Sequence, residues 1–426
     1  MSDAAKTIDT PESQPTDEVR AFRLTGGVLD AGMSSMATFV AALVAARILT
    51  DTELGVYAVF YTAFNFGQVI ANNLVYIPSE VLVVSWPVAA RLRAMKQTTR
   101  LALGPSLAGA SAVGIATLIA AQVAESSLVV PLTVTAGITT FLWPTQDHVR
   151  RMLHIAELSW HAAAVSVVQF VTVLTSIGAL LVLDVPAAWI PYGSLGIANA
   201  TSLITGLALA RHYHIRTRRR DLAAGTDPIK LRLRELVHAG SWLLAGVGAP
   251  TLAAMGSATI ITFVAGPDIL GYAEAARIVA QPVLVLGTGL GFVLGPRLMR
   301  AAIAREPAVS RSIHLRFNTI VVVSAASYAV LAAWPWPGNP MSTLLPHAFE
   351  VPWLVPVTIA AHVVMAAVVL LLQELMAARQ ARLIGLVGML SAPLQLLAAA
   401  TAGVTGAFAR PMSMVAGAGA RPVSYT

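Results

Sequence analysis

The segment PDILGYAEAARIVAQPVLVLGTGLGFVLGPR, residues 267–297, decides the fold class of this chain. It is mostly apolar over more than the roughly 20 residues that a helix needs to cross a bilayer. It nevertheless contains Glu274, Arg277 and Gln281. A charged side chain at the centre of a bilayer costs about 2.5–3.5 kcal/mol on insertion scales, so it needs a partner or a wet surrounding. The segment therefore predicts a membrane-spanning helix that carries a polar site.

The composition of the whole chain agrees with this reading. Of its 426 residues, 56% are hydrophobic and 12% are charged, and the mean hydropathy is +0.72. A soluble domain has about 25% charged residues. The sequence therefore predicts an all-α polytopic membrane protein. It has no cysteine, which excludes disulfides, thiol nucleophiles and cysteine metal sites. Because ATPase and zinc-hydrolase signatures are also absent, we expect no catalytic residue, no metal site, no cofactor and no enzymatic activity.

Apolar segments of about 20 residues predict about twelve spans, of which the last is the weakest. The second is too long for one straight helix, and Asn65, Gln68, Asn72 and Asn73 at its centre predict a bend before Pro78. The predicted spans are 26–48, 55–84, 101–123, 127–143, 159–183, 188–210, 237–263, 268–295, 315–334, 352–373, 383–402 and 404–420.

The linking segments divide the chain into two halves. Residues 1–24 are polar and predict a disordered cytoplasmic tail. The basic segment 211–236 lies at the midpoint of the chain and predicts a cytoplasmic linker. It separates an N-terminal six-helix bundle, 25–210, from a C-terminal six-helix bundle, 237–420.

The basic residues predict the orientation of the chain. With both termini in the cytoplasm, all of the 28 Lys and Arg residues lie in cytoplasmic segments except Arg47, Arg277 and Arg410. Such a bias is the positive-inside pattern of multi-pass proteins of the plasma membrane. The net charge of +7 is thereby explained by topology, with membrane lipids as secondary partners and without a nucleic-acid partner.

The two halves resemble each other in sequence. ILTDTELGVYAVFYTAF at 48–64 aligns with VAGPDILGYAEAARIVA at 264–280, which places Gly55 opposite Gly271 at an offset of 216 residues. Two copies with the same orientation predict a pseudo-two-fold axis along the membrane normal, with a substrate path between the halves.

The sequence resembles a known family in several of these segments. They are AARILTDTELGVYAVFYTAF at 45–64, LGYAEAARIVAQPVLVLGTGLGFVLGPRLMR at 270–300, LLQELMAARQARLIGLVGML at 371–390 and AGVTGAFA at 402–409. They resemble the O-antigen-type polysaccharide flippases of the multidrug/oligosaccharidyl-lipid/polysaccharide exporter superfamily. The resemblance implies a pair of helix bundles that alternate access to a central cavity, and a substrate with a polyprenyl pyrophosphate tail and a saccharide head.

The first candidate site is Glu274 and Arg277, which are three residues apart and so share one helix face. Arg277 is expected near the middle of the membrane, where its guanidinium group suits a phosphate of the lipid carrier. Glu274 tunes it or exchanges protons in this interpretation, and Gln281 lies one turn further on the same face. The alternative is an intrahelical ion pair with no role in binding.

Other polar residues extend the candidate substrate site. Asn65, Gln68 and Asn72 share one face of the second span and are candidates for contacts with sugar hydroxyls. The alternative for these three is interhelical hydrogen bonding. Arg410 in the last span is a candidate that reaches the cavity.

Asp30 in the first span is the candidate for binding a coupling proton or cation. The alternative places it near the inner membrane surface, hydrogen-bonded to Ser34 or a headgroup. The sequence therefore predicts a flippase that moves a lipid-linked saccharide from the inner to the outer leaflet without a chemical step.

 The residues leave two other functions open. One is a multidrug or cation antiporter on the same fold. The other is a non-transporting membrane scaffold that works with other proteins of cell-surface glycan assembly in the cell envelope.

Overall fold

The structure is a computed structural model that describes residues 17–83, 86, 88–221, 231–346, 349, 351, 353–378 and 380–423. This part of the chain is helical and contains no strand. Eleven of its helices are long and apolar enough to cross a membrane. The predicted fold class, an all-α membrane protein of about twelve helices in two bundles, is confirmed.

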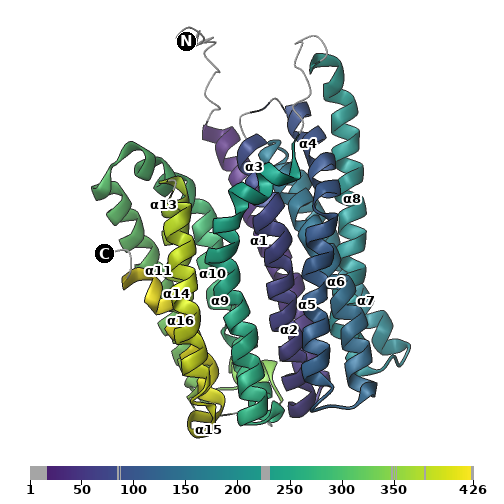
Figure 1. Ribbon diagram of the computed structural model, residues 1–426, viewed down its shortest axis with the longest axis vertical. Coiled ribbons are helices and arrows are strands. Elements are labelled where there is room, and N and C mark those ends of the chain that lie inside the picture. The colour runs from purple at the N-terminus through teal and green to yellow at the C-terminus, as the bar shows by residue number, and fades with distance from the viewer. Residues whose placement is uncertain are drawn as a thin grey trace.

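The first bundle lies on the right of Figure 1, in purple to blue-green. Its helices are α1 (Asp17–Ile48), α2 (Asp51–Ala71), the π-helical η1 (Asn72–Tyr76), α3 (Ile77–Val83), α4 (Val88–Leu101), α5 (Leu103–Ala120), α6 (Ser126–Ile155), α7 (Ser159–Val182), the short η2 (Ala187–Trp189) and α8 (Ile190–Asp221).

The second bundle lies on the left of Figure 1, in green to yellow. Its helices are α9 (Leu233–Val264), α10 (Pro267–Ala304), α11 (Pro307–Ala333), α12 (Pro340–Leu344), α13 (Leu354–Ala377), α14 (Ala381–Ala399), α15 (Ala402–Thr405), η5 (Gly406–Phe408) and α16 (Ala409–Val423). The two bundles meet where α2 packs against α9 and α10. We call the end of the molecule at which α2 and α10 begin the outer face, after the orientation that the basic residues predict.

Helices extend into two of the predicted linking segments. The predicted disordered tail, 1–24, is helical from Asp17 onward, where the acidic first turn favours a helix N-terminus. The predicted linker, 211–236, contains the end of α8 and the start of α9. Residues 1–16 and 222–230 of these two segments lie outside the described residues.

The second span begins and is interrupted as its sequence suggests. Thr50 and Glu53 form a capping box at the start of α2, in which each side chain binds the backbone N–H of the other residue. The π-helical turn begins at Asn72, within the polar centre that predicts a bend. Such turns are frequent at functional positions of helices.

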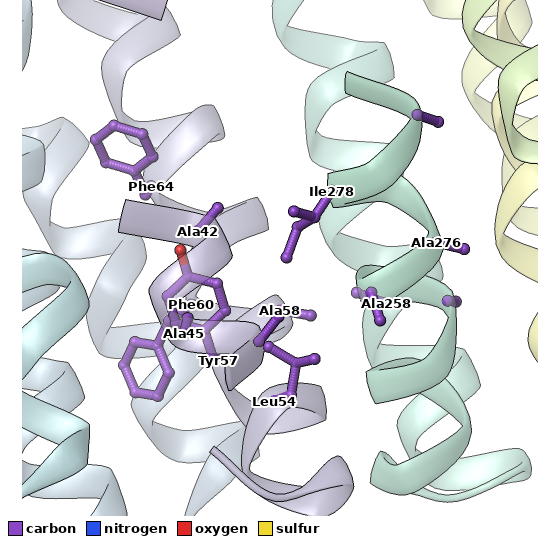
Figure 2. Packing of buried hydrophobic residues seen from close by; sticks show 14 of the residues in the cluster. Ala42, Ala45, Leu54, Tyr57, Ala58, Phe60, Phe64, Ala258, Ala276 and Ile278 are labelled. Atoms are coloured by element: carbon purple, nitrogen blue, oxygen red, sulfur yellow. The ribbon is translucent and has the colours of Figure 1, made fainter. Parts of the chain in front are cut away.

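The aligned glycines confirm the register of the internal repeat. A Cβ atom on Gly55 would overlap the carbonyl oxygen of Pro267, and a Cβ atom on Gly271 would overlap that of Asp51. These two contacts exchange under the offset of 216 residues. Around them, Figure 2 shows Leu54 and Ala58 of α2 beside the helices of the other half. The two halves are therefore related by a pseudo-two-fold axis at this point.

A glycine within the first bundle allows a direct test of helix packing. A Cβ atom on Gly67 would lie 2.5 Å from the carbonyl oxygen of Gly109 and 2.5 Å from Cγ2 of Thr140. Gly67→Ala is expected to lower the free energy of unfolding by about 1–3 kcal/mol, the usual cost of overpacking. Thermal unfolding in detergent measures it. Gly137→Ala, whose Cβ atom meets nothing within 4 Å, is the control, and an equal effect in both variants would contradict the packing.

Candidate functional site

The Arg277 side chain lies at the interface of the two halves and is 7% exposed. Its guanidinium group donates to both carboxylate oxygens of Glu274, at 2.9 and 2.7 Å. It also donates to Oε1 of Gln281 at 3.2 Å. The three polar residues of the deciding segment therefore form one cluster on α10. The ion pair that the sequence leaves as an alternative is present, and Glu274 is fully buried in it.

Arg277 also crosses to the other half. Its guanidinium carbon lies 4.1 Å from the centre of the Tyr61 ring of α2, and Nη1 donates to the Tyr61 hydroxyl at 3.4 Å. Tyr61 stands 216 residues before Arg277, so the two residues are counterparts in the repeat. A cation over an aromatic face gains about 2 kcal/mol or more when it is desolvated. The pair therefore connects the halves at equivalent positions of α2 and α10.

Arg410 is the second buried cation near this interface and is 6% exposed. Its Nη1 donates to the backbone carbonyl of Ala254 at 3.1 Å, and its Nε has no hydrogen-bond partner. Within the described part of the chain no carboxylate lies at ion-pair distance from it. A buried charge in this condition is costly, which makes Arg410 a strong candidate for binding an anion.

The two arginines lie at a similar depth. Arg277 is ten residues from the start of α10. Ala254, whose carbonyl binds Arg410, is ten residues from the end of α9, which runs antiparallel to α10. At 1.5 Å per residue, both positions lie about 15 Å from the outer ends of these helices. Glu274 and Arg277 are close enough to Arg410 to interact with its charge. Two cations and one carboxylate thus give this central cluster a net charge of +1.

The amide side chains of the second span divide between two places. Asn65 donates to the carbonyl of Tyr61 at 2.8 Å and accepts from Gln68 at 3.0 Å, and both amides are partly exposed. Asn72 instead accepts from Arg151 of α6 at 3.0 Å. Asn65 and Gln68 therefore lie next to the central cluster through Tyr61, whereas Asn72 belongs to the first bundle.

Asp30 lies inside the first bundle and is 3% exposed. It accepts from Arg150 at 2.5 Å, His154 at 2.8 Å and Ser166 at 2.5 Å. Ser34, the partner that the sequence suggests, does not contribute. Coupling through Asp30 stays a prediction, and it would require this ion pair to open.

The same network continues across α6. Arg150 donates to Asp147 at 2.6 Å, Arg151 donates from Nε to both oxygens of Glu80 at 3.0 Å, and His148 lies 2.7 Å from Glu80. The predicted spans leave Arg150 and Arg151 in a cytoplasmic loop, which is wrong because α6 continues to Ile155.

A sequence signal for this continuation existed. Val149, Met152 and Leu153 have helical spacing and are buried, so the apolar face of α6 persists between the charges. No group of three or more His, Asp or Glu residues that could hold a metal ion occurs among the described residues.

The comparisons with known proteins concern the fold. No family model matches this sequence, and no curated protein matches it. An inward-facing multidrug resistance MATE family transporter of the MOP superfamily is similar in structure, with a TM-score of 0.69, 10% identity and coverage of 94% of this chain and 96% of that chain.

Two further solved structures are similar over nearly their whole length. A MATE transporter from Vibrio cholerae, solved as an Asp-to-Asn mutant, has a TM-score of 0.56 at 12% identity and coverage of 96% and 95%. A MOP superfamily transporter from Pyrococcus furiosus, whose binding pocket is described as having reversed polarity, has a TM-score of 0.55 at 14% identity and coverage of 95% of this chain and 94% of that chain.

 The chain therefore has the fold of the MATE transporters of the MOP superfamily.

Proposed function

We propose that this chain is a multi-pass transporter of the plasma membrane that moves an anionic, lipid-linked saccharide from the inner to the outer leaflet by alternating access. One observation carries the proposal. Arg410 is a buried cation with a free Nε and without a carboxylate partner in the described part of the chain, at the same depth as the Arg277–Glu274 pair. A phosphate or pyrophosphate group supplies the missing negative charge, and guanidinium groups bind such groups in a bidentate manner.

The surroundings of the cluster suit the saccharide part of such a cargo. Asn65, Gln68 and Gln281 are partly exposed amides within two turns of the Tyr61–Arg277 pair. Amide groups can both donate to and accept from sugar hydroxyls. The proposed site thus consists of Arg410 and Arg277 for the anion, with Glu274 as the partner of Arg277 and these amides for the sugar.

A cation or multidrug antiporter needs a carboxylate that is available to a positively charged cargo. The buried carboxylates among the described residues are Asp30, Glu80 and Glu274. Each is already bound by an arginine, which is Arg150, Arg151 and Arg277 respectively. The net charge of the central cluster therefore favours an anionic cargo over a cationic one.

A non-transporting scaffold predicts a dry, closely packed interface between the halves. The contacts of Gly55 with Pro267 and of Gly271 with Asp51 are of this kind. They lie at the outer face, so they equally fit a transporter that is closed on that side. We also propose that membrane lipids and other glycan-assembly proteins are partners of this chain. Both termini lie in the cytoplasm in this proposal.

Ligand-dependent stability tests the proposed cargo class. A ligand that binds only the folded protein raises its stability by RT ln(1 + [L]/Kd), which is about 2.7 kcal/mol at a hundredfold excess over Kd. We expect the melting temperature in detergent to rise with a polyprenyl-pyrophosphate-linked saccharide. The same saccharide on an uncharged polyprenol and a lipophilic cation such as ethidium are the controls. A rise with ethidium alone would contradict the proposal and favour the antiporter.

A further inference from the structure

The outer ends of α2 and α10 cross in a reciprocal way. Gly55 touches the backbone of Pro267, and Gly271 touches the backbone of Asp51, so closely that neither position has room for a Cβ atom. Each glycine lies against the first turn of the helix from the other half. The backbones are therefore in direct contact at two places that the pseudo-two-fold axis exchanges.

Side chains strengthen this crossing from both halves. The Tyr272 hydroxyl donates to Oδ2 of Asp51 at 3.3 Å. Arg47, at the end of α1, donates to the carbonyl oxygen of Leu344 at 3.2 Å and to that of Thr343. The Arg47 side chain thus connects the end of α1 to the short helix α12 of the second half.

The central cluster lies directly inward of the crossing on the same two helices. Tyr61 is six residues after Gly55, and Arg277 is six residues after Gly271. At 1.5 Å per residue this is about 9 Å along each helix. A group bound at the Arg277 cluster and leaving between α2 and α10 toward the outer face would have to pass the crossing.

We infer that the two glycine crossings, Gly55–Pro267 and Gly271–Asp51, form the outer gate of the path between the halves, and that they open together. Backbone atoms in van der Waals contact leave no room for a headgroup. Because the axis exchanges the two contacts, a rigid-body rotation that separates one separates the other. The inference rests on the proposed function for what passes the gate, but its test needs no cargo.

The chain has no native cysteine, so a single introduced thiol reports accessibility. Gln281→Cys, next to Arg277, is labelled with a membrane-impermeant maleimide added at the outer face of intact cells. Adding Gly55→Ala or Gly271→Ala should obstruct closure and raise the labelling rate about tenfold, the population shift that ~1.4 kcal/mol of clash produces. Gly289→Ala on α10, whose Cβ atom meets nothing within 4 Å, should leave the rate unchanged.

The reciprocal geometry sharpens this test. Gly55→Ala and Gly271→Ala should give similar rates, and the double variant should gain little over either, because both open one gate. Unchanged labelling in both variants, or a response in one of them only, would overturn the inference.

A cross-link gives a second measurement that leaves both glycines intact. Asp51→Cys with Tyr272→Cys replaces a pair of side chains in contact, and a short bifunctional thiol reagent should join them in high yield, as read by mass spectrometry. The yield should fall several-fold when Gly55→Ala is added. A low yield in the glycine-intact protein would show that the gate is not closed as described. Labelling that responds as expected in a protein that moves no lipid-linked saccharide would leave the gate standing and remove the proposed function.

Discussion

Glu274→Ala is expected to lower the free energy of unfolding by about 3–5 kcal/mol, because it leaves the buried Arg277 without its counter-ion. The Glu274 carboxylate is fully buried and accepts two hydrogen bonds from that guanidinium group. Tyr61 and Gln281 remain as neutral partners, which do not balance the charge. Thermal or denaturant unfolding in detergent measures the loss.

Two further variants make this prediction specific. Adding Arg277→Met to Glu274→Ala should recover most of the stability, because an apolar replacement of a whole buried pair is often neutral or stabilising. Glu235→Ala removes an exposed partner of Arg232, at 3.9 Å, and should cost less than about 1 kcal/mol. A double variant as unstable as Glu274→Ala would contradict the assignment of the loss to the uncompensated charge.

Arg410→Met is expected to act in the opposite way on stability and on binding. It removes a buried cation that has no carboxylate partner in the described residues, so the melting temperature should stay the same or rise. It should weaken binding of a polyprenyl-pyrophosphate-linked saccharide about 30-fold or more, since losing one partner of a buried charged contact costs ~2–5 kcal/mol. Titration of the labelled lipid against both proteins measures the change.

The control for this variant is Arg234→Met, which removes an exposed arginine near the start of α9. It changes the net charge by the same amount as Arg410→Met. The affinity for the cargo should stay within about twofold of the wild-type value, because an exposed charge is screened by salt. Equal affinities in wild type and Arg410→Met would remove Arg410 from the site. A strongly lowered melting temperature in Arg410→Met would show that this arginine stabilises the fold instead.

The fold was largely predictable from the sequence, because apolar length and the distribution of arginines depend on the bilayer alone. The repeat register was also visible, and it places Tyr61 opposite Arg277. Their contact was not predicted, since an offset shows which residues are equivalent but not that they meet on the axis. The structure adds that meeting, with the ring and the guanidinium group in contact.

The charged network of the first bundle was missed for a different reason. The predicted span ends at Trp143 because a dense run of polar residues follows, which favoured a loop over a continued helix. The run includes Asp147, His148, Arg150 and Arg151. Their partners come from α1, α3 and α4. Contacts between segments so far apart in the chain cannot be predicted from the neighbouring residues. The predicted and observed helix ends differ for a related reason. Polar extensions of a helix, such as the start of α1 at Asp17, lack the apolar residues from which the spans were predicted.

Translocation of a fluorescent polyprenyl-pyrophosphate-linked saccharide in liposomes tests the central claim most directly. A membrane-impermeant quencher distinguishes the lipid of the two leaflets. We predict that wild-type protein equilibrates the lipid between the leaflets, and that Arg410→Met, reconstituted at the same amount, does not do so above the rate of protein-free liposomes. Wild-type protein that leaves the lipid in its original leaflet, or equal rates for wild type and Arg410→Met, would contradict the account.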